Sequence, residues 1–259
     1  MDRKKLLNMA ESDEEKILLS RIIDILTATE EKNIIRNSQF LNGHEINLAK
    51  KVADNFSVLY GFFGGYDEAE RCMLVSYPDF LYPENEDVPI KVIKAQTKNK
   101  SRLSHRDYMG AVLNLGIKRE KIGDIVVCDD CGYIFCADDI ADYIVSQIEK
   151  IGNCGVVLSV SDFGNVSVPP KQFKEITDSV SSLRLDALVS AATGLSRADA
   201  SALIQRGGVS VNWEVKDKND FKPCEGDMLS VHGHGRILFY KVGGNSKKGR
   251  TFVTLRRYI

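Results

Sequence analysis

The sequence predicts an α+β protein made of three successive parts, and three observations lead to this class. Hydrophobic residues make up 43% of the 259 residues and charged residues 27%, an ordinary balance for a globular protein. Stretches with helical spacing of apolar residues alternate with short apolar runs that end at Gly, Pro or Asp. The apolar runs are far shorter than the ~18 residues that span a bilayer, and no secretory signal is recognisable. We therefore predict a cytoplasmic protein without membrane insertion, whose six cysteines are reduced.

The first part, residues 1–80, is predicted to combine two helices with a pair of strands. Ser12 followed by Glu15 predicts a capping box at the start of the first helix. The predicted elements are helices at Ser12–Ala28 and Asn42–Phe56 and strands at Val58–Phe63 and Arg71–Ser76. Proline and acidic residues in Tyr77–Asp87 predict a connector, and we place a domain boundary there.

The middle part, residues 88–161, has the element order β-α-β-β-α-β. This is the order of a ferredoxin-like domain, which also underlies RNA-recognition modules and many unrelated domains. The predicted elements are strands at Val88–Ala95, Ile122–Cys128, Tyr133–Cys136 and Val156–Val160 and helices at His105–Leu115 and Asp138–Ile151. The order of elements alone therefore predicts the fold of this part and not its function.

The third part, residues 182–259, is predicted to place two helices on a small bent sheet. Ser161–Ser181 contains Gly164, Pro169 and Pro170 and reads as a linker with a possible strand near Glu175–Val180. Ser196 is predicted to cap the second helix. The predicted elements are helices at Leu183–Ala192 and Arg197–Gln205 and strands at Val209–Val211, Met228–Val231, Ile237–Val242 and Phe252–Arg257.

Charge is distributed unevenly along the chain, although the net charge is only −1. From Ser182 to the end there are 13 Lys and Arg against 7 Asp and Glu, whereas the rest has 22 against 29. A basic segment on an acidic body is typical of a module that contacts phosphates, and chance clustering is the alternative.

Four segments of the third part resemble the RNA-binding domain named after small-subunit ribosomal protein S-four. They are Ser182-Leu-Arg-Leu-Asp-Ala-Leu188, Gly194-Leu-Ser-Arg-Ala-Asp-Ala-Ser-Ala-Leu-Ile204, Gly207-Gly-Val-Ser-Val-Asn212 and Gly226-Asp-Met-Leu-Ser-Val231. Gly233-His-Gly-Arg236 repeats the family's usual basic ending. The resemblance implies two helices on a small sheet with a basic face for structured RNA. Its expected RNA-binding residues are Arg184, Ser196, Arg197, Arg206, Asn212 and Arg236.

The residues themselves explain how such a face can bind RNA. Arg184 and Arg197 begin the two helices, so both guanidinium groups can face one track of phosphates. Backbone N–H groups beside Ser196 can add to this anion site. Asp186 is expected to hold Arg184 or Arg197 in place instead of touching RNA, because phosphate repels a carboxylate. Trp213 can stack on a base or pack against the domain.

Segments outside the third part resemble the YlmH-type proteins of Gram-positive bacteria. They are Gly64-Gly-Tyr-Asp-Glu-Ala-Glu-Arg71, Ser104-His-Arg-Asp-Tyr-Met-Gly-Ala-Val-Leu-Asn-Leu-Gly-Ile-Lys-Arg-Glu-Lys-Ile-Gly-Asp124 and Lys247-Lys-Gly-Arg250. The resemblance implies a cytoplasmic, ribosome-associated protein with a middle domain regarded as RNA-binding. It further implies ribosomal RNA and tRNA as partners, on large ribosomal subunits with stalled peptidyl-tRNA, in translation quality control. Chromosomal neighbourhood links the family to cell division.

Basic residues also surround one helix of the middle part. His105, Arg106, Lys118, Arg119 and Lys121 flank the helix, and Lys94, Lys98, Lys100 and Arg102 precede it. Such a density can track a nucleic-acid backbone, and we predict RNA contacts at His105, Arg106, Lys118 and Arg119. A solvated helix face is the alternative. Arg71 is expected to pair with Glu68 or Asp124 in the interior.

We predict a binding protein without catalytic residues, cofactor, metal or small-molecule substrate. Cys128, Cys131 and Cys136 resemble half of a zinc knuckle, but a second cysteine pair is missing from the sequence. The alternative is an RNA-modifying enzyme with an unrecognised active site in residues 1–160, for which His105, Asp107 and Asp124 are the candidates. A third possibility is a scaffold whose acidic N-terminal part binds another protein.

Overall fold

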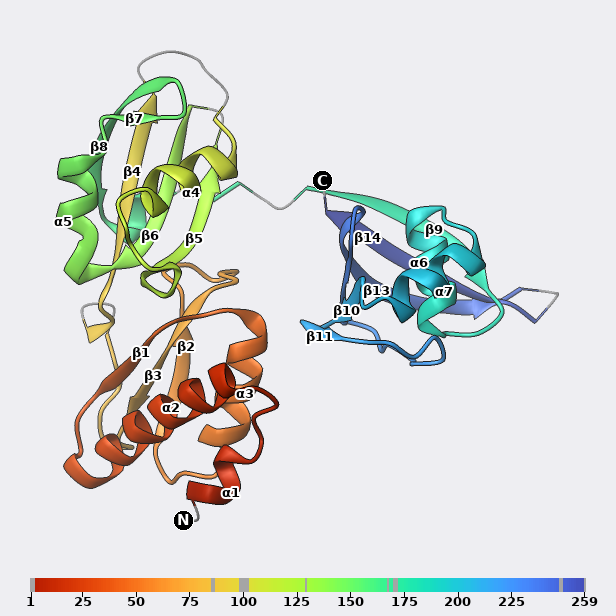
Figure 1. The fold of residues 1–259 in the computed structure, drawn as a ribbon, viewed down its shortest axis with the longest axis horizontal. Helices are drawn as coiled ribbons and strands as arrows, with labels where there is room; N and C mark the ends of the chain where they lie inside the picture. The colour runs from red at the N-terminus through yellow and green to blue at the C-terminus, as the bar shows by residue number, and fades with distance from the viewer. Residues whose placement is uncertain are drawn as a thin grey trace. The chain divides into compact units, whose positions relative to one another are not determined.

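The computed structural model describes residues 3–84, 87–97, 103–128, 130–166, 168–169, 172–246 and 249–258. The chain divides into two compact units, residues 1–169 and residues 170–259 (Figure 1). Helices and three separate sheets confirm the α+β class. The first two predicted domains, residues 1–80 and 88–161, lie in the same unit, and their separation stays a prediction.

A three-stranded sheet with the order β1-β3-β2 organises the first part of the chain. Its elements are α1 (Arg3–Leu7), α2 (Asp13–Lys32), β1 (Arg36–Leu41), α3 (Gly43–Ala53), β2 (Leu59–Phe63) and β3 (Cys72–Tyr77). β3 is the central strand, and all six of its residues are buried. Apolar residues of α2 and α3 pack on this sheet and form one core cluster with Leu41 and Leu74. β1 was not predicted, because four polar residues begin it.

Of the two hydrogen bonds in the capping box predicted for α2, the structure contains one. The Ser12 side chain accepts from the Glu15 N–H. The Glu15 carboxylate accepts from the N–H of Glu11, which lies one residue before the position used by a capping box. α2 also continues to Lys32, beyond the predicted end, and stops where Asn33 takes a left-handed conformation with φ 53°.

The middle part contains the predicted order of elements with one additional strand. Its elements are β4 (Ile90–Thr97), α4 (His105–Leu113), η2 (Arg119–Lys121), β5 (Ile122–Val127), β6 (Cys131–Ala137), α5 (Asp138–Gln147), β7 (Lys150–Ile151), β8 (Cys154–Ser161) and η3 (Phe163–Asn165). The sheet has the order β5-β6-β4-β8-β7 with antiparallel neighbours, which is consistent with a ferredoxin-like arrangement. The last predicted helix is too long, because a tight turn at Gly152, with φ +56°, joins β7 to β8.

The first and middle parts share a hydrophobic core cluster. Phe40 and Met73 from the first sheet pack in it with Val92 and Phe135 from the second sheet. A Cβ added at Gly123 would lie 2.6 Å from the Phe40 ring, so only glycine fits this close approach. The two sheets are therefore packed against each other within the first unit.

The second unit consists of two helices on a six-stranded sheet. Its elements are β9 (Phe173–Val180), α6 (Leu185–Thr193), α7 (Arg197–Gln205), β10 (Val209–Val211), β11 (Glu214–Val215), β12 (Met228–Val231), β13 (Gly235–Asn245) and β14 (Thr251–Tyr258). The strand order is β11-β10-β12-β13-β14-β9. Both helices pack against one face of the sheet, where Phe239, Val253 and Leu255 are fully buried.

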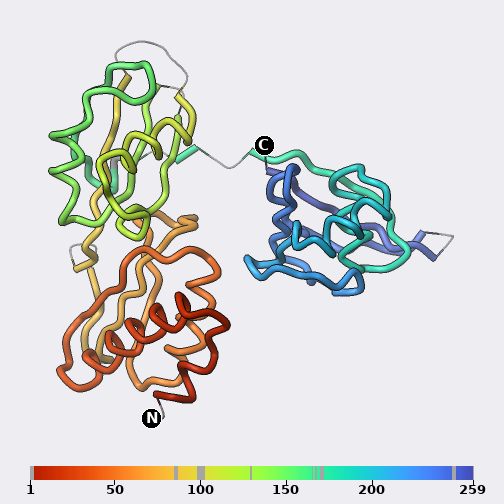
Figure 2. Tube along the Cα trace, in the orientation of Figure 1, coloured from red at the N-terminus to blue at the C-terminus, as the bar shows by residue number. Residues whose placement is uncertain are grey.

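The possible strand predicted near Glu175–Val180, inside the linker Ser161–Ser181, is confirmed as β9 and is two residues longer. β9 pairs with β14 through eight consecutive residue pairs, from Phe173–Tyr258 to Val180–Thr251. Figure 2 shows β9 and β14, which are far apart in the sequence, running side by side. The second unit therefore begins before β9 and not at Ser182.

Candidate nucleic-acid interface

Arg184 and Arg197 converge on one buried carboxylate. Arg184 lies immediately before α6, and its Nε donates to Asp186 Oδ1 at 3.1 Å. Arg197 is the first residue of α7, and its Nη2 donates to Asp186 Oδ2 at 2.7 Å. The Asp186 side chain is only 9% exposed, whereas the arginine side chains are 38% and 49% exposed. Asp186 thus holds both members of this arginine pair, where the sequence predicted one or the other, and leaves part of each guanidinium group open to solvent.

The electrostatic environment keeps Asp186 ionised. Burial alone would raise the pKa of the Asp186 carboxyl group. The hydrogen bonds and positive charges of Arg184 and Arg197 outweigh this effect, so the pKa lies below its ordinary value. One negative charge between two positive charges leaves the site with an excess positive charge near neutral pH.

The start of α7 is less open to an anion than the sequence predicted. Ser196 Oγ accepts from the Asp199 N–H at 3.1 Å and donates to Asp199 Oδ2 at 2.7 Å. The Ser196 hydroxyl is therefore used to cap the helix, and Asp199 adds a negative charge to the same end. This end is already neutralised in part, so Arg197 is better placed than the backbone to meet a phosphate. RNA binding by Ser196 stays a prediction.

Arg206 lies at the other end of α7, about 13 Å from the start of this nine-residue helix. Its Nε donates to the Ala202 carbonyl at 3.1 Å. Arg206 and Arg236 both line an open groove of about 650 Å³, together with the backbone at Gly207 and Gly208. We call this feature the arginine groove.

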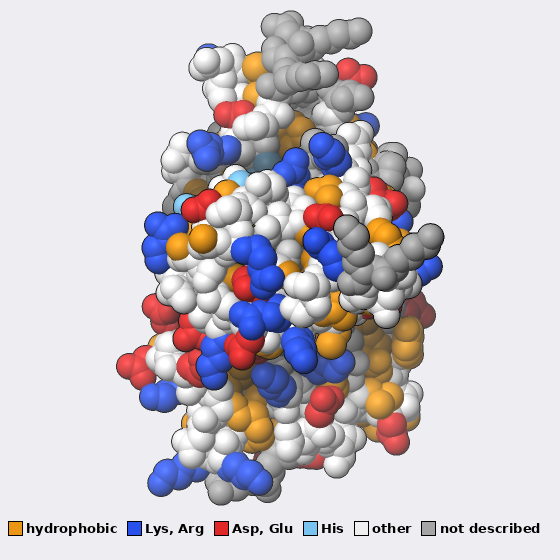
Figure 3. All heavy atoms as spheres, turned by 90° about the vertical axis from the view of Figure 1, so that its right-hand side faces the viewer, with side chains coloured by type: hydrophobic (Ala, Val, Ile, Leu, Met, Phe, Trp, Pro, Cys, Tyr) orange, Lys and Arg blue, Asp and Glu red, His pale blue; other side chains and the backbone are white. Residues whose placement is uncertain are grey.

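The predicted basic face therefore consists of two patches, the arginine pair and the arginine groove. Figure 3 shows one side of the molecule, on which Lys and Arg side chains gather in several groups with fewer Asp and Glu side chains among them. Which of these arginines touches RNA stays a prediction.

Asn212 orients a hairpin. Asn212 and Trp213 form the two-residue loop between β10 and β11, with φ values of 48° and 67°. Positive φ at both positions is the signature of a type I′ turn. Asn212 Nδ2 donates to Asp227 Oδ1 at 2.8 Å, and Asn212 Oδ1 accepts from the Met228 N–H at 2.9 Å. The turn-orienting role of Asn212 is thus visible in its hydrogen bonds, while a contact with RNA stays a prediction.

The basic residues of the middle part have different surroundings. Arg106 and Lys118 are exposed. Arg119 Nη1 donates to the carbonyls of Ile122 and Gly123, and burial together with the charge of Arg71 lowers the Arg119 pKa to about 10. Arg119 therefore has a structural role that the charge pattern did not reveal. Lys98, Lys100 and Arg102 lie outside the described residues.

The pKa of His105 lies below its ordinary value. Desolvation is the main cause, and the charge of Arg119 adds to it. The charges of Asp124 and Glu70 act in the opposite direction without cancelling the effect. The lowered pKa therefore makes exposed His105 contribute less positive charge to the predicted basic patch at neutral pH than an ordinary histidine does.

Asp124 and Arg71 connect the first sheet to the second. Asp124 on β5 accepts from the Tyr66 hydroxyl at 2.8 Å and from the N–H groups of Glu70 and Arg71 at 2.6 and 3.2 Å. The Arg71 guanidinium group donates to the carbonyls of Ile122 at 2.9 Å and Phe40 at 3.1 Å. Arg71 was expected to pair with Glu68 or Asp124; its guanidinium group instead donates to backbone carbonyls, while burial lowers its pKa and the charge of Asp124 partly offsets that effect. The motif residues Tyr66, Arg71 and Asp124 thus have a shared role in packing the first unit.

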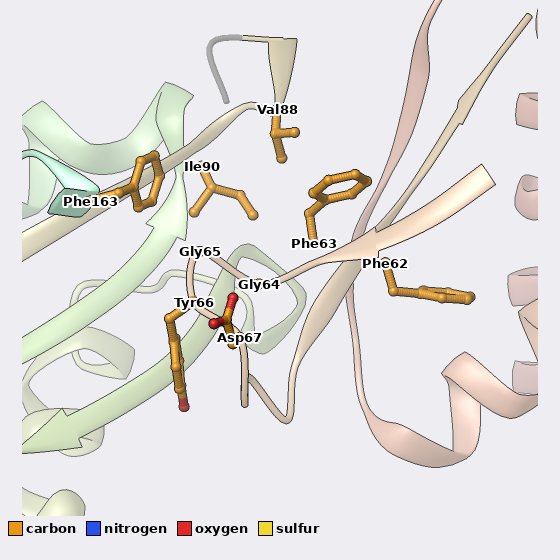
Figure 4. Close-up of a pocket in the computed structure, with 9 residues that line it drawn as sticks. All are labelled: Phe62, Phe63, Gly64, Gly65, Tyr66, Asp67, Val88, Ile90 and Phe163. Atoms are coloured by element: carbon orange, nitrogen blue, oxygen red, sulfur yellow. The ribbon is translucent and has the colours of Figure 1, made fainter. Parts of the chain in front are cut away.

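The three candidate catalytic residues are not brought together by a described cavity. Asp107 Oδ2 accepts from the N–H and hydroxyl of Ser104 and so caps α4. Asp124 is engaged by Tyr66 and the neighbouring backbone. A cavity of about 490 Å³ lies elsewhere in the first unit, where Phe63, Ile90 and Phe163 surround it and Asp67 is its charged residue (Figure 4).

The cysteines of the chain form neither a disulfide nor a zinc knuckle among the described residues. The structure describes all six cysteines, and burial raises the pKa of Cys136 to about 12. Among the described residues, no group of three or more His, Cys, Asp or Glu side chains is arranged to hold a metal ion. In the same part of the chain, no helix is both long and apolar enough to cross a membrane.

Comparison with known families agrees with the division of the chain. Residues 83–165 match a domain described as "Putative RNA-binding domain in YlmH", and residues 183–229 match the S4 domain. The S4 match contains the arginine pair, Arg206 and Asn212. The YlmH match contains the entire five-stranded sheet and α4.

Two relatives extend the resemblance beyond single domains. The chain is 31% identical over 245 residues to "Ribosome-associated protein quality control protein P2" of Bacillus subtilis (strain 168), covering 94% of this chain and 95% of that protein. A solved structure, "Cell division protein ylmH from Streptococcus pneumoniae", has 25% identity and a TM-score of 0.53, covering 62% of this chain and 98% of that chain. With its YlmH-type and S4 domains in this order and a relative matched along almost its whole length, the chain belongs to the YlmH family of RNA-binding-domain proteins.

Proposed function

We propose that this protein binds ribosomal RNA and tRNA on the large ribosomal subunit and acts without catalysis in translation quality control in the cytoplasm. The chain carries two RNA-binding domain types. Its relative from Bacillus subtilis is named as a ribosome-associated quality control protein. Binding to large subunits that hold stalled peptidyl-tRNA is the specific activity that we assign to it.

The arginine pair is the observation that carries the proposal. Phosphate recognition by arginine depends on a planar group that is held in position and can donate two hydrogen bonds. Asp186 holds both guanidinium groups, and each remains partly exposed. The site therefore loses little conformational freedom when RNA binds. We propose that the arginine pair and the arginine groove contact the sugar-phosphate backbone.

The middle domain supplies a second surface in this proposal. Arg106 and Lys118 are exposed near the two ends of α4 and can reach phosphates. Two weak contacts in one chain strengthen each other, because the first raises the effective concentration of the second. We expect the middle domain to add affinity and the S4 domain to dominate it.

The test is co-sedimentation of the full-length protein with ribosomes in a sucrose gradient. Replacing both members of the arginine pair by alanine would leave Asp186 buried without its partners, so the test variant is Arg184→Ala/Asp186→Asn/Arg197→Ala. Its control is Lys16→Ala/Arg21→Ala, which removes two exposed positive charges from α2. We expect the triple variant to leave the ribosomal fractions and the control to remain there.

Two results would contradict the proposal. One is a triple variant that keeps its circular dichroism spectrum and still co-sediments as the wild type does. The other is a change in mass of ribosomal RNA or tRNA after incubation with the protein, which would show that it modifies RNA.

A further inference from the structure

One face of the six-stranded sheet points away from the helices of the second unit. α6 and α7 pack on the opposite face, over Phe239, Val253 and Leu255. Side chains alternate between the two faces along each strand, so the residues between these buried positions point outward. The outward residues of β9, β13 and β14 include Phe173, Glu175, Tyr240, Phe252 and Arg256.

Arg256 lies between two aromatic rings on this outward face. Its guanidinium carbon is 3.2 Å from the centroid of the Tyr240 ring and 4.5 Å from the centroid of the Phe173 ring. Arg256 Nε also donates to Glu175 Oε2 at 3.1 Å. These contacts hold the guanidinium group next to both rings, so this part of the face is ordered before any ligand binds.

The aromatic side chains of this face are unusually open to solvent. Phe173, Tyr240 and Phe252 are 42%, 44% and 44% exposed. Gly243 lies opposite Phe252, where an added Cβ would come within 3.1 Å of the Phe252 Cβ. The three rings lie along an extended track, because Phe173 is opposite Tyr258 at one end of β14 and Phe252 is near the other end, six residues or about 20 Å away. Exposed apolar side chains gathered on one face are typical of a binding site.

The charge of the face indicates what binds there. Arg236 lies on the same side of β13 as Tyr240, and an irregularity between Phe239 and Lys241 breaks the alternation, so that Lys241, opposite Thr254, lies there too. Among the described outward residues of β9, β13 and β14, these two and Arg256 outnumber the carboxylate of Glu175. Unpaired nucleobases stack on aromatic rings and guanidinium planes, while their phosphates require nearby cations. Arg236 also lines the arginine groove, so the sheet face continues a surface already assigned to RNA.

We propose that Phe173, Tyr240, Phe252 and Arg256 form a stacking surface for unpaired nucleotides of RNA. This inference rests on the proposed RNA-binding function and adds the class of RNA segment that one face recognises. The helix side of the S4 domain contacts the backbone of structured RNA, and the sheet face takes bases that are free of pairing. A paired stem cannot use this face, because its bases are already stacked on one another.

The test measures binding of the full-length protein to a ten-nucleotide oligouridylate and to a fully paired 16-base-pair RNA. The variant Tyr240→Leu/Phe252→Leu keeps apolar bulk but removes two rings. Stacking on an aromatic side chain is worth roughly 1–3 kcal/mol per base, so we expect a loss of at least about fivefold in oligouridylate affinity. Affinity for the paired RNA should stay within twofold. Thr177→Ala on exposed β9 is the control and should bind both RNAs as the wild type does.

The outcomes separate this inference from the proposed function. Unchanged oligouridylate binding by the leucine variant would overturn the stacking surface. A wild type that co-sediments with ribosomes but does not bind oligouridylate would overturn it too, while the proposed function stands. If the wild type binds neither ribosomes nor oligouridylate, the stacking surface and the proposed function are both overturned. Should the leucine variant unfold, the ring-retaining variant Tyr240→Phe/Phe252→Tyr decides: wild-type binding supports stacking, and loss of binding overturns it.

Discussion

Asp186 holds two arginines at the starts of two consecutive helices, so a single carboxylate links RNA affinity to stability. Its pKa is lowered in the folded state, because Arg184 and Arg197 outweigh the effect of burial. A carboxyl group with a depressed folded pKa stabilises the protein above its unfolded pKa of about 4. This contribution is lost as the pH falls through the folded pKa.

We therefore expect Asp186→Asn to destabilise the second unit by about 1–3 kcal/mol at pH 7, the range for hydrogen bonds to charged groups. The difference from the wild type should shrink at pH 3, because this pH lies below the unfolded pKa of about 4 and the ionised carboxylate gives less net stability there. Urea unfolding followed by fluorescence measures this directly, since Trp213 is the single tryptophan of the chain and lies in the second unit. An equal difference at both pH values would show that the carboxylate charge does not contribute.

Arg197 has a structural partner, and this changes what its removal should do. From the sequence we expect Arg197→Ala to leave the thermal midpoint nearly unchanged, because Ser196 still caps α7. The hydrogen bond of Arg197 to buried Asp186 instead predicts a loss of stability as well as a loss of about 1–3 kcal/mol of RNA affinity. Arg197→Ala in the Asp186→Asn background separates the loss of stability from the loss of RNA affinity, because the asparagine side chain is not a buried charge that needs Arg197. Wild-type RNA affinity in a folded Arg197→Ala protein would remove Arg197 from the interface.

At the scale of elements, the hairpin of β10 and β11 depends on an unusual turn. The backbone of Asn212 has a positive φ, which the turn requires. Its side chain donates a hydrogen bond to Asp227 and accepts one from the Met228 N–H. Asn212→Gly should lose only the side-chain hydrogen bonds, while Asn212→Ala should also suffer backbone strain. We expect alanine to lower the urea midpoint more than glycine does, as measured by circular dichroism. Equal midpoints would contradict the role of the positive φ.

Two elements show what local sequence pattern can and cannot reveal. The helices α6 and α7 follow from apolar periodicity and from Ser196, and both occur with shifts of at most two residues. β1 begins with four polar residues, and half-exposed β9 lacks apolar alternation, so neither has a strong strand signal. Both become strands because a neighbour pairs with them, β3 for β1 and β14 for β9. Pairing between distant segments is not visible in a window of sequence.

Some contacts of the candidate site could be predicted from the sequence, and others could not. The arginine pair could be predicted, because Arg184, Asp186 and Arg197 stand at the starts of adjacent helices. The separation of Arg206 from Arg197 follows from the length of α7 and could have been noticed in the sequence. The aromatic contacts of Arg256 could not, because Phe173 lies more than 80 residues before it and meets it only through the pairing of β9 with β14.

At the scale of the whole molecule, β9 and β14 determine which piece of the chain can bind RNA alone. From the sequence we expect Ser182–Val242 to suffice, but this piece lacks β9 and β14 and therefore core residues Val180, Val253 and Leu255. A piece comprising residues 170–259 should fold and retain RNA binding, and residues 1–169 should bind far more weakly. Filter binding at physiological salt compares them, and comparable affinities would argue against the S4 domain as the main contact.

Salt dependence tests whether phosphates dominate the contact. Neutralisation of four to six phosphates by the arginine pair, the arginine groove and their neighbours predicts a slope of about −3 to −5 for log K against log salt, at −0.7 to −0.9 per phosphate. The slope should become shallower by roughly one for each arginine removed. A slope near zero would mean that binding is not led by phosphates.

In the cell, we expect this protein to bind ribosomal RNA and tRNA through its second unit. Crosslinking in cells followed by sequencing of the bound RNA tests it most directly. We expect ribosomal RNA of the large subunit and tRNA to dominate with the wild type, and both to be depleted with Arg184→Ala/Asp186→Asn/Arg197→Ala. Enrichment of messenger RNA alone, or crosslinks that the triple variant retains in full, would contradict it.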